Sequence, residues 1–126
     1  MAKAIYVEDD PGQRRLLPMV LSGKGVDFKL DLATYEDYNS GAEAIRTAQE
    51  LDLLITDISM PGGRGYNLIS QARERFPNVP AIVLSADTRD LTEARKVVNG
   101  TERVFYREKP YDIREFRGLV GQLLKG

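Results

Sequence analysis

The chain has 126 residues and a formal net charge of −1, from 18 basic and 19 acidic residues, and 42% of its residues are hydrophobic. This balance is typical of an ordinary soluble protein and excludes a strongly basic surface for nucleic acid, while no apolar run approaches the roughly 20 residues that cross a bilayer. The absence of cysteine and histidine excludes disulfides, thiol catalysis, zinc-thiolate sites and any phosphate carried on an imidazole of this chain.

Short apolar runs alternate with stretches of helical period along the chain, beginning with a run at 4–7. Asp10 and Pro11 then fit a helix cap and the first helical position. Pro18 lies inside this helix, where proline removes a hydrogen bond, so we expect the helix to kink or restart there. Four residues at helical spacing form its predicted buried face: Leu16, Leu17, Val20 and Leu21.

The second strand and the second helix follow. Phe28, Leu30 and Leu32 alternate with charged residues, which predicts a strand at a sheet edge with one face in water. Ser40 and Glu43 fit a capping box that opens the second helix. Residues 35–39 are therefore expected to form an extended loop.

The middle of the chain holds the strand expected at the centre of the sheet. The run at 53–56 has four successive apolar or β-branched residues and ends at Asp57, as a strand covered on both faces should. The loop 60–65 contains three glycines, which allow positive φ, and the third helix after it stops before Pro77. A fourth strand at 81–84 ends in Ser85.

The last part of the chain repeats the alternation. A fourth helix around 91–98 is ended by Asn99 and Gly100, a fifth strand at 104–106 leads to Lys109, and Asp112 caps a fifth helix. Five strands alternating with five helices predict an α/β fold with an open, doubly wound parallel sheet. A closed eight-stranded barrel would need about twice this chain length.

Charged and polar residues stand at the carboxyl ends of four predicted strands. They are Glu8, Asp9, Asp57, Ser85 and Lys109. Because the carboxyl ends of parallel strands share one edge of a sheet, we expect these side chains to converge. Three carboxylates repel one another unless a cation offsets them, and Mg²⁺ prefers such oxygen ligands together with a phosphate. The sequence therefore predicts a site for Mg²⁺ (or Mn²⁺) and a phosphoryl group.

Four motifs carry a family resemblance. They are Val7-Glu8-Asp9-Asp10, residues 52–57 followed by Met60-Pro61-Gly62, Ile82-Val83-Leu84-Ser85-Ala86, and Lys109-Pro110. In this order and spacing they resemble the receiver domain of two-component response regulators, of the single-domain, chemotaxis-regulator-like kind. The resemblance covers nearly the whole chain and implies one receiver domain over residues 1–126. It also implies a flavodoxin-like five-stranded sheet with strand order 2-1-3-4-5.

The resemblance assigns the metal and phosphoacceptor residues. Asp57 would be the nucleophile and phosphoacceptor, taking its phosphoryl group from a histidine of a sensor histidine kinase or of a histidine phosphotransfer protein. Asp57 and Asp9 would supply oxygens to Mg²⁺ directly, and Glu8 would act through a water. The backbone carbonyl of Ser59 would fill a further position.

The resemblance also assigns a switch. Ser85 and Lys109 would bind phosphoryl oxygens, and Tyr106 would repack as the hydroxyl of Ser85 follows the phosphoryl group. A downstream protein target would bind the face made by the fourth helix, the fifth strand and the fifth helix, without contact to a membrane or to nucleic acid. The chain would be a cytoplasmic regulatory phosphoacceptor rather than an enzyme, with at most self-phosphorylation and self-dephosphorylation activity, and its N-terminus does not read as a signal peptide.

Three other functions compete with this interpretation. A nucleotide-binding flavodoxin-like protein should have donor-rich residues after the first strand, where Glu8-Asp9-Asp10 instead repels phosphate unless a metal intervenes. A phosphatase with an aspartyl nucleophile would carry a second acid where Ser59 stands. A receiver-like interaction module that does not use phosphorylation ranks second, and a lack of Mg²⁺ binding would promote it.

Several features depart from the receiver pattern. The segment 25–41 is longer than expected, and Pro18 is expected to reshape the face on which a phosphodonor docks. Arg107-Glu108 replaces an apolar pair before the lysine, which places charge beside the site or on the sheet edge. Asp87 adds an acid near the expected position of the phosphate.

Overall fold

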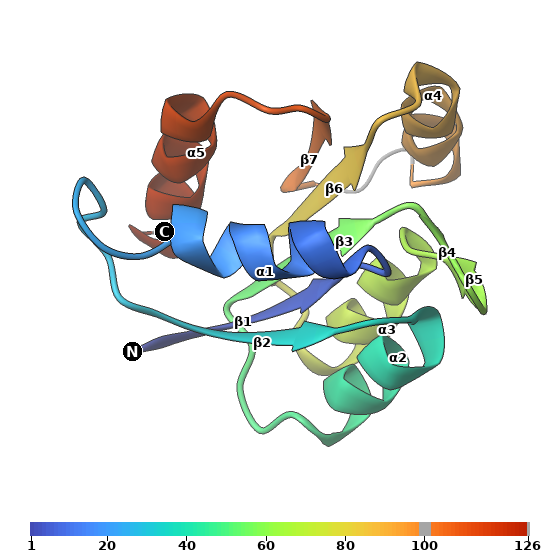
Figure 1. The fold of residues 1–126 in the computed structure, drawn as a ribbon. Helices are drawn as coiled ribbons and strands as arrows, with labels where there is room; N and C mark the ends of the chain where they lie inside the picture. Colours follow the sequence, from blue (N-terminus) through green and yellow to red (C-terminus); the bar gives the residue numbers. More distant parts are fainter. Residues whose placement is uncertain (99–101, 126) are drawn as a thin grey trace.

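The computed structural model describes residues 1–98 and 102–125. Its main sheet contains the parallel strands β1 (Ala2–Val7), β2 (Leu30–Tyr35), β3 (Leu53–Asp57), β6 (Ala81–Ser85) and β7 (Val104–Glu108). Their spatial order is β2-β1-β3-β6-β7 (Figure 1). Counted along this sheet alone, the order is 2-1-3-4-5, so the predicted flavodoxin-like topology is confirmed.

Helices cover both faces of this sheet (Figure 1). They are α1 (Pro11–Val20), α2 (Tyr38–Thr47), α3 (Asn67–Arg75), α4 (Thr88–Val97) and α5 (Ile113–Lys125). Side chains of α1 and α5 pack with one face of the sheet, and side chains of α2, α3 and α4 pack with the other. Two hydrophobic layers therefore enclose the sheet.

The middle of the sheet is the most buried part of the fold. Every residue of β3 is buried, and Leu53, Leu54 and Ile55 alternate between the two hydrophobic layers. Residues of β2 alternate between half-buried and exposed over most of its length, as expected of an edge strand. Because β1 and β6 flank β3, the carboxyl ends of these three strands lie side by side.

A short antiparallel hairpin follows β3 where a loop was expected. It pairs β4 (Ser59–Met60) with β5 (Gly63–Arg64). The glycines of this segment were expected to allow positive φ, and among them only Gly62 adopts it, at 94°. Gly63 is required for another reason, because a Cβ there would lie 2.9 Å from the ring of Tyr38. The hairpin thus packs directly against the start of α2.

Because of this packing, α2 starts earlier in the sequence than predicted. The helix begins at Tyr38 and is capped by Asp37, whose Oδ1 accepts a hydrogen bond of 2.8 Å from the Ser40 amide. The predictions of Ser40 as the cap and of an extended loop over 35–39 are therefore wrong. The Tyr38 amide also donates to the carbonyl of Pro61 in the hairpin, at 3.2 Å, and this contact favours the earlier start.

The first helix confirms one expectation and corrects two. Asp10 is its cap, accepting from the Gln13 amide at 2.8 Å. Leu16 is 50% exposed rather than buried, because the helix turns Leu17 and Val20 toward the sheet. The helix runs through Pro18 to Val20, so it does not restart there, although the proline has no amide hydrogen to donate to the carbonyl of Arg14.

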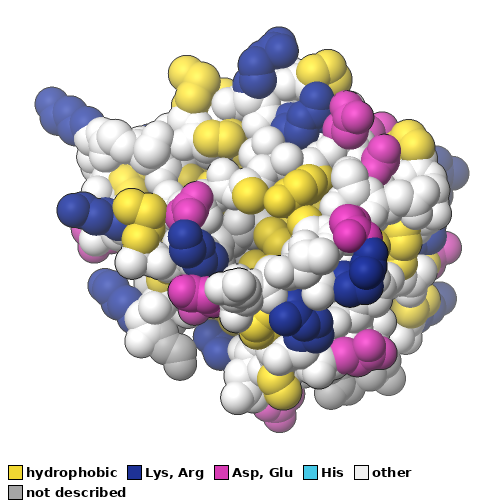
Figure 2. All heavy atoms as spheres, turned by 90° about the horizontal axis from the view of Figure 1, so that it is seen from below, with side chains coloured by type: hydrophobic (Ala, Val, Ile, Leu, Met, Phe, Trp, Pro, Cys, Tyr) yellow, Lys and Arg dark blue, Asp and Glu magenta, His cyan; other side chains and the backbone are white. Residues whose placement is uncertain are grey.

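The surface carries charges of both signs. Figure 2 shows one face on which basic and acidic side chains are interspersed with hydrophobic ones. In the described ranges, none of the helices has the length and apolar character of a membrane span. The expected helix end at Asn99 and Gly100 lies outside the described residues, and α4 is described up to its cap, Val98.

Candidate functional site

Three carboxylates meet at the carboxyl ends of β1 and β3. One oxygen each from Glu8, Asp9 and Asp57 lies within 4.8 Å of the others. Glu8 is 1% exposed and Asp57 9% exposed, whereas Asp9 faces solvent. β1 and β3 are paired, and Val7 lies opposite Thr56. Glu8 and Asp57 directly follow these two residues, so the pairing places them side by side.

Lys109 extends from the loop after β7 into this cluster. Its Nζ donates hydrogen bonds to Oε1 of Glu8 at 2.9 Å and to Oε1 of Gln13 at 2.6 Å, and it forms an ion pair with Oδ1 of Asp57 at 3.2 Å. The lysine backbone is fixed as well, because its amide donates to the Ser85 carbonyl at 2.8 Å. The predicted convergence of Glu8, Asp57 and Lys109 is thus observed.

Burial and charge shift the ionisation of this cluster. Burial raises the pKa of Asp57, although the nearby ammonium of Lys109 acts in the opposite direction. Partial desolvation, followed by the proximity of Glu8, raises the pKa of Asp9. Burial would lower the pKa of Lys109, but Glu8 and Asp57 outweigh it and raise that pKa. One ammonium therefore only partly offsets three carboxylates.

The donor set of the cluster fits a divalent cation. Carboxylate oxygens from two strands converge within the span that one ion can bridge, and hard cations such as Mg²⁺ prefer such ligands. Ser59, whose carbonyl was predicted as a further ligand, lies in β4 two residues beyond Asp57 and pairs with Arg64 of β5. Its hairpin is anchored by a hydrogen bond of 2.7 Å from the Gly65 amide to the Ile58 carbonyl.

Ser85 ends β6 beside this cluster and is 4% exposed. Its Oγ accepts a hydrogen bond of 3.0 Å from the Asp87 amide at the start of α4. The Asp87 carboxylate does not stand free, because it caps α4 and accepts from the backbone and the side chain of Arg89. The acid expected near the phosphate is therefore engaged in holding the helix.

The aromatic residue predicted as a switch is half-buried. Tyr106 packs against the hydrophobic layer of α2, α3 and α4, and the guanidinium carbon of Arg95 lies 4.8 Å from its ring centroid. The charge of Arg107, which departs from the receiver pattern, is paired with Glu115 of α5 at 2.8 Å. That charge thus lies between β7 and α5 and not in the acidic cluster.

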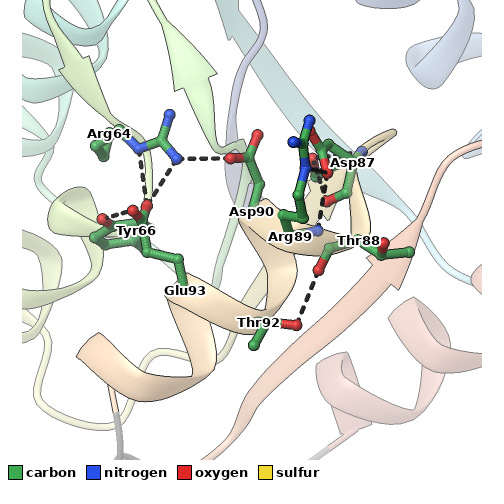
Figure 3. A network of polar contacts seen from close by, with 9 residues as sticks. Arg64, Tyr66, Asp87, Thr88, Arg89, Asp90, Thr92 and Glu93 are labelled. Atoms are coloured by element: carbon green, nitrogen blue, oxygen red, sulfur yellow. Dashed lines mark hydrogen bonds and ion pairs between the residues drawn. The ribbon is translucent and has the colours of Figure 1, made fainter.

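A second polar network joins the hairpin to α4. Figure 3 shows the guanidinium of Arg64 between two acids of that helix, Asp90 and Glu93, each with an oxygen 2.7 Å from its Nη2. The hydroxyl of Tyr66 also donates to Glu93, at 2.8 Å. The segment that follows Asp57 is therefore tied to the same helix that Ser85 reaches through Asp87.

Two residues of the site were not predicted. Tyr6 donates from its buried hydroxyl to Oε1 of Glu8 at 3.3 Å, and Gln13 accepts from Lys109. Tyr6 occupied an ordinary strand position and Gln13 an ordinary first-turn position of a helix. The alternation of residues in the first strand could have placed Tyr6 on the side of α1, but no sequence pattern identified its partner.

Comparison with known proteins identifies relatives over almost the whole chain. Residues 4–120 match the response regulator receiver domain family. The DNA-binding transcriptional regulator NtrC of Klebsiella pneumoniae is 34% identical over 122 residues, which are 96% of this chain and 24% of that protein. The response regulator Rre1 of Synechocystis is 34% identical over 124 residues, which are 95% of this chain and 50% of that protein. The chain thus spans a quarter to a half of these relatives.

Solved structures show the same arrangement. The receiver domain of the Francisella response regulator 1452 superposes with a TM-score of 0.77 at 26% identity, covering 99% of this chain and 98% of that one. The Vibrio cholerae chemotaxis protein CheY4 superposes with a TM-score of 0.78 at 20% identity, covering 98% and 99% of the two chains. The second likeness supports the fold alone.

Proposed function

This chain belongs to the response regulator receiver domain family, and on that basis we propose that Asp57 accepts a phosphoryl group from a histidine of a partner protein. The observation that carries the proposal is the convergence of Asp57, Glu8, Asp9 and the Lys109 ammonium at one edge of the sheet. Receivers are regulatory phosphoacceptor domains that take their input from sensor histidine kinases. The imidazole must lie outside this sequence, which has no histidine.

The transfer step follows from the groups in the site. An oxygen of the Asp57 carboxylate donates an electron pair to phosphorus. The bond from phosphorus to the donor nitrogen breaks, and its electron pair returns to the imidazole of the partner. The product is an acyl phosphate on Asp57. We propose that Lys109 donates a hydrogen bond to one phosphoryl oxygen and that Ser85, at the end of the neighbouring strand β6, donates to another.

Glu8, Asp9 and Asp57 would hold Mg²⁺ or Mn²⁺, and we propose the backbone carbonyl of Ser59 as a further ligand. When bound, such an ion neutralises negative charge on the carboxylate and phosphoryl oxygens as they approach. The residues of the chain itself orient the nucleophile. Lys109 forms an ion pair with the Asp57 carboxylate, and the buried end of β3 holds the Asp57 backbone.

Phosphorylation would be reported through α4, β7 and α5. The phosphoryl group adds up to about two negative charges, which attract the Ser85 hydroxyl and the Lys109 ammonium. Movement of Ser85 would pull on Asp87 at the start of α4, and Tyr106 would repack beside Arg95. A downstream protein that binds this face would then sense the state of Asp57.

Intact mass after incubation with acetyl phosphate, with and without Mg²⁺, tests the proposal. We expect a single phosphoryl adduct that requires Mg²⁺ and is lost in Asp57→Asn. No adduct on the folded protein under either condition would instead favour a receiver-like interaction module that works without phosphorylation.

A further inference from the structure

The ammonium of Lys109 has an acceptor that lies outside the acidic cluster. Oε1 of Gln13 is 2.6 Å from Lys109 Nζ, closer than Glu8 at 2.9 Å or Asp57 at 3.2 Å. An ammonium has three hydrogens and no acceptor site, so the amide of Gln13 must present its oxygen to the lysine. Two of these hydrogens are donated to Glu8 and Gln13, whereas Asp57 is reached only as an ion pair, which leaves one donor for a further acceptor.

The backbone of Gln13 is held independently of this contact. It lies in the first turn of α1, and its amide donates to the capping carboxylate of Asp10 at 2.8 Å. The next residue, Arg14, donates to the carbonyls of Glu8 and Asp9 at 2.8 and 3.3 Å. The first turn of α1 is thus fastened to the end of β1, which fixes the place from which the Gln13 side chain reaches the lysine.

A neutral acceptor suits this position better than a charged or an apolar group. A carboxylate would add a fourth negative charge to a cluster that already has three. A hydrocarbon would leave a largely buried donor without an acceptor, because the Lys109 side chain is only 11% exposed. The ammonium would then move toward Asp57 and occupy the oxygen that must attack phosphorus.

We propose that Gln13 is a positioning residue that holds the Lys109 ammonium between Glu8 and Asp57. It keeps the contact with Asp57 the longest of the three, so that the nucleophile is oriented without being closely paired and one donor is directed toward the incoming phosphoryl group. The effect on phosphorylation rests on the proposed function, whereas the effect on the lysine does not.

The first test compares Gln13→Met, which keeps the length of the side chain but removes the acceptor, with Gln122→Met on the exposed side of α5. Phosphorylation by acetyl phosphate is followed by intact mass at saturating Mg²⁺. We expect Gln13→Met to be slower by about three- to tenfold, the equivalent of one hydrogen bond, and Gln122→Met to be unchanged. Circular dichroism verifies that both variants are folded.

The second test needs no phosphodonor. The ¹⁵Nζ resonance of Lys109, assigned by its loss in Lys109→Met, reports on the hydrogen bonds of the ammonium to Glu8 and Gln13. We expect Gln13→Met to shift and broaden this signal and Gln122→Met to leave it in place. An unchanged signal in Gln13→Met, or a changed signal with a wild-type rate, overturns the proposal. If the wild-type protein takes no phosphoryl group, the proposed function fails, and the signal alone decides whether Gln13 positions Lys109.

Discussion

Gly65 closes the turn after Asp57 and leaves no room for a side chain. A Cβ there would overlap the carbonyl oxygen of Asp57 and lie 2.5 Å from Oγ1 of Thr56. Neither neighbour can move easily, since Thr56 Oγ1 already donates to that carbonyl at 2.8 Å and both residues belong to the buried strand β3. Glycine is therefore required at position 65 because neighbouring atoms approach its backbone closely, and not because its φ is unusual.

We expect Gly65→Ala to lower the free energy of unfolding by about 2–3 kcal/mol, because the backbone of β3 or of the hairpin must shift to admit the methyl group. Urea denaturation measures the change. Gly118→Ala is the matched control: nothing lies within 4 Å of a Cβ at that position of α5, so alanine should stabilise the protein by about 0.5–1 kcal/mol. Equal destabilisation by both substitutions would contradict the steric argument.

Asp57 is expected to oppose folding at neutral pH when no cation is bound. Burial raises its pKa, so the folded state holds the proton more tightly than the unfolded state does. For such a group, stability is greatest at low pH and is lost as the pH rises from the ordinary value of 3.8 through the raised pKa. Asn resembles the protonated acid, so Asp57→Asn should be more stable than the wild type at pH 7.

The gain from Asp57→Asn should disappear as the pH falls below the ordinary pKa of aspartate. Urea midpoints at neutral and at acidic pH, both without Mg²⁺, measure this. Lys109 keeps Glu8 and Gln13 as acceptors in the variant, which limits any loss from the broken ion pair. A variant less stable than wild type at pH 7 would show that the pairing with Lys109 outweighs the burial of Asp57.

At the residue scale, the sequence predicted the charged part of the site but not its neutral part. Glu8, Asp9, Asp57 and Lys109 follow strands, and parallel strands end at one edge, so their meeting follows from topology. Gln13 lies on a helix, and the direction of a helical side chain depends on how the helix is rotated against the sheet. That rotation is set by packing, which also left Leu16 exposed against expectation.

At the scale of elements, the hairpin β4–β5 couples the site to α4. Arg64 of β5 pairs with Ser59 in the hairpin register and bridges Asp90 and Glu93 on α4. We expect Arg64→Ala to cost about 1 kcal/mol, since charge-assisted hydrogen bonds to two carboxylates are lost at a partly exposed position. Hydrogen exchange of the α4 amides should become several-fold faster in this variant.

Arg89→Ala is the control for that prediction. Arg89 also pairs with an acid at the start of α4, but its side chain is 90% exposed and its partner, Asp87, belongs to the same helix end. We expect little change in α4 exchange. If both arginine variants accelerate exchange alike, the bridge to the hairpin does not restrain the helix and only the local charge matters.

The starts of α1 and α2 show why local sequence signals predict only some of the helix boundaries. Asp10 was predicted as a cap because a proline at the next position leaves few alternatives, and it is one. Two overlapping capping signals stand near α2, Asp37 with Ser40 and Ser40 with Glu43. The first is used, since Tyr38 contacts the hairpin through Pro61 and Gly63. Only this long-range contact distinguishes them.

At the scale of the molecule, the fold class could be predicted because the order of the elements and the hydropathy of the strands indicate the same architecture. Strands and helices alternate, the central strand is apolar throughout, and the edge strand is amphipathic, so an open parallel sheet follows from the pattern. The order of its strands was predicted from the resemblance to receiver domains, and the structure has that order. The hairpin after β3 was not predictable. Its strands have two residues each, too few to show a period.

The stability of the whole molecule should depend on Mg²⁺. The chain as a whole is nearly neutral, yet three carboxylates and one ammonium are concentrated at one edge of the sheet. A cation that binds there only in the folded state stabilises the protein by mass action, by about 2.7 kcal/mol at 100 times its Kd. We therefore expect the thermal midpoint to rise with MgCl₂ and not with NaCl of the same ionic strength.

Asp9→Asn should abolish this dependence without unfolding the protein, because Asp9 is exposed and its removal relieves repulsion with Glu8. The matched control is Asp27→Asn, at an exposed position outside the acidic cluster, which should keep the full response. A Mg²⁺ response that survives in Asp9→Asn would mean that the ion binds elsewhere. Without Mg²⁺, Asp9→Asn should be at least as stable as the wild type, since one of three mutually repelling charges is gone.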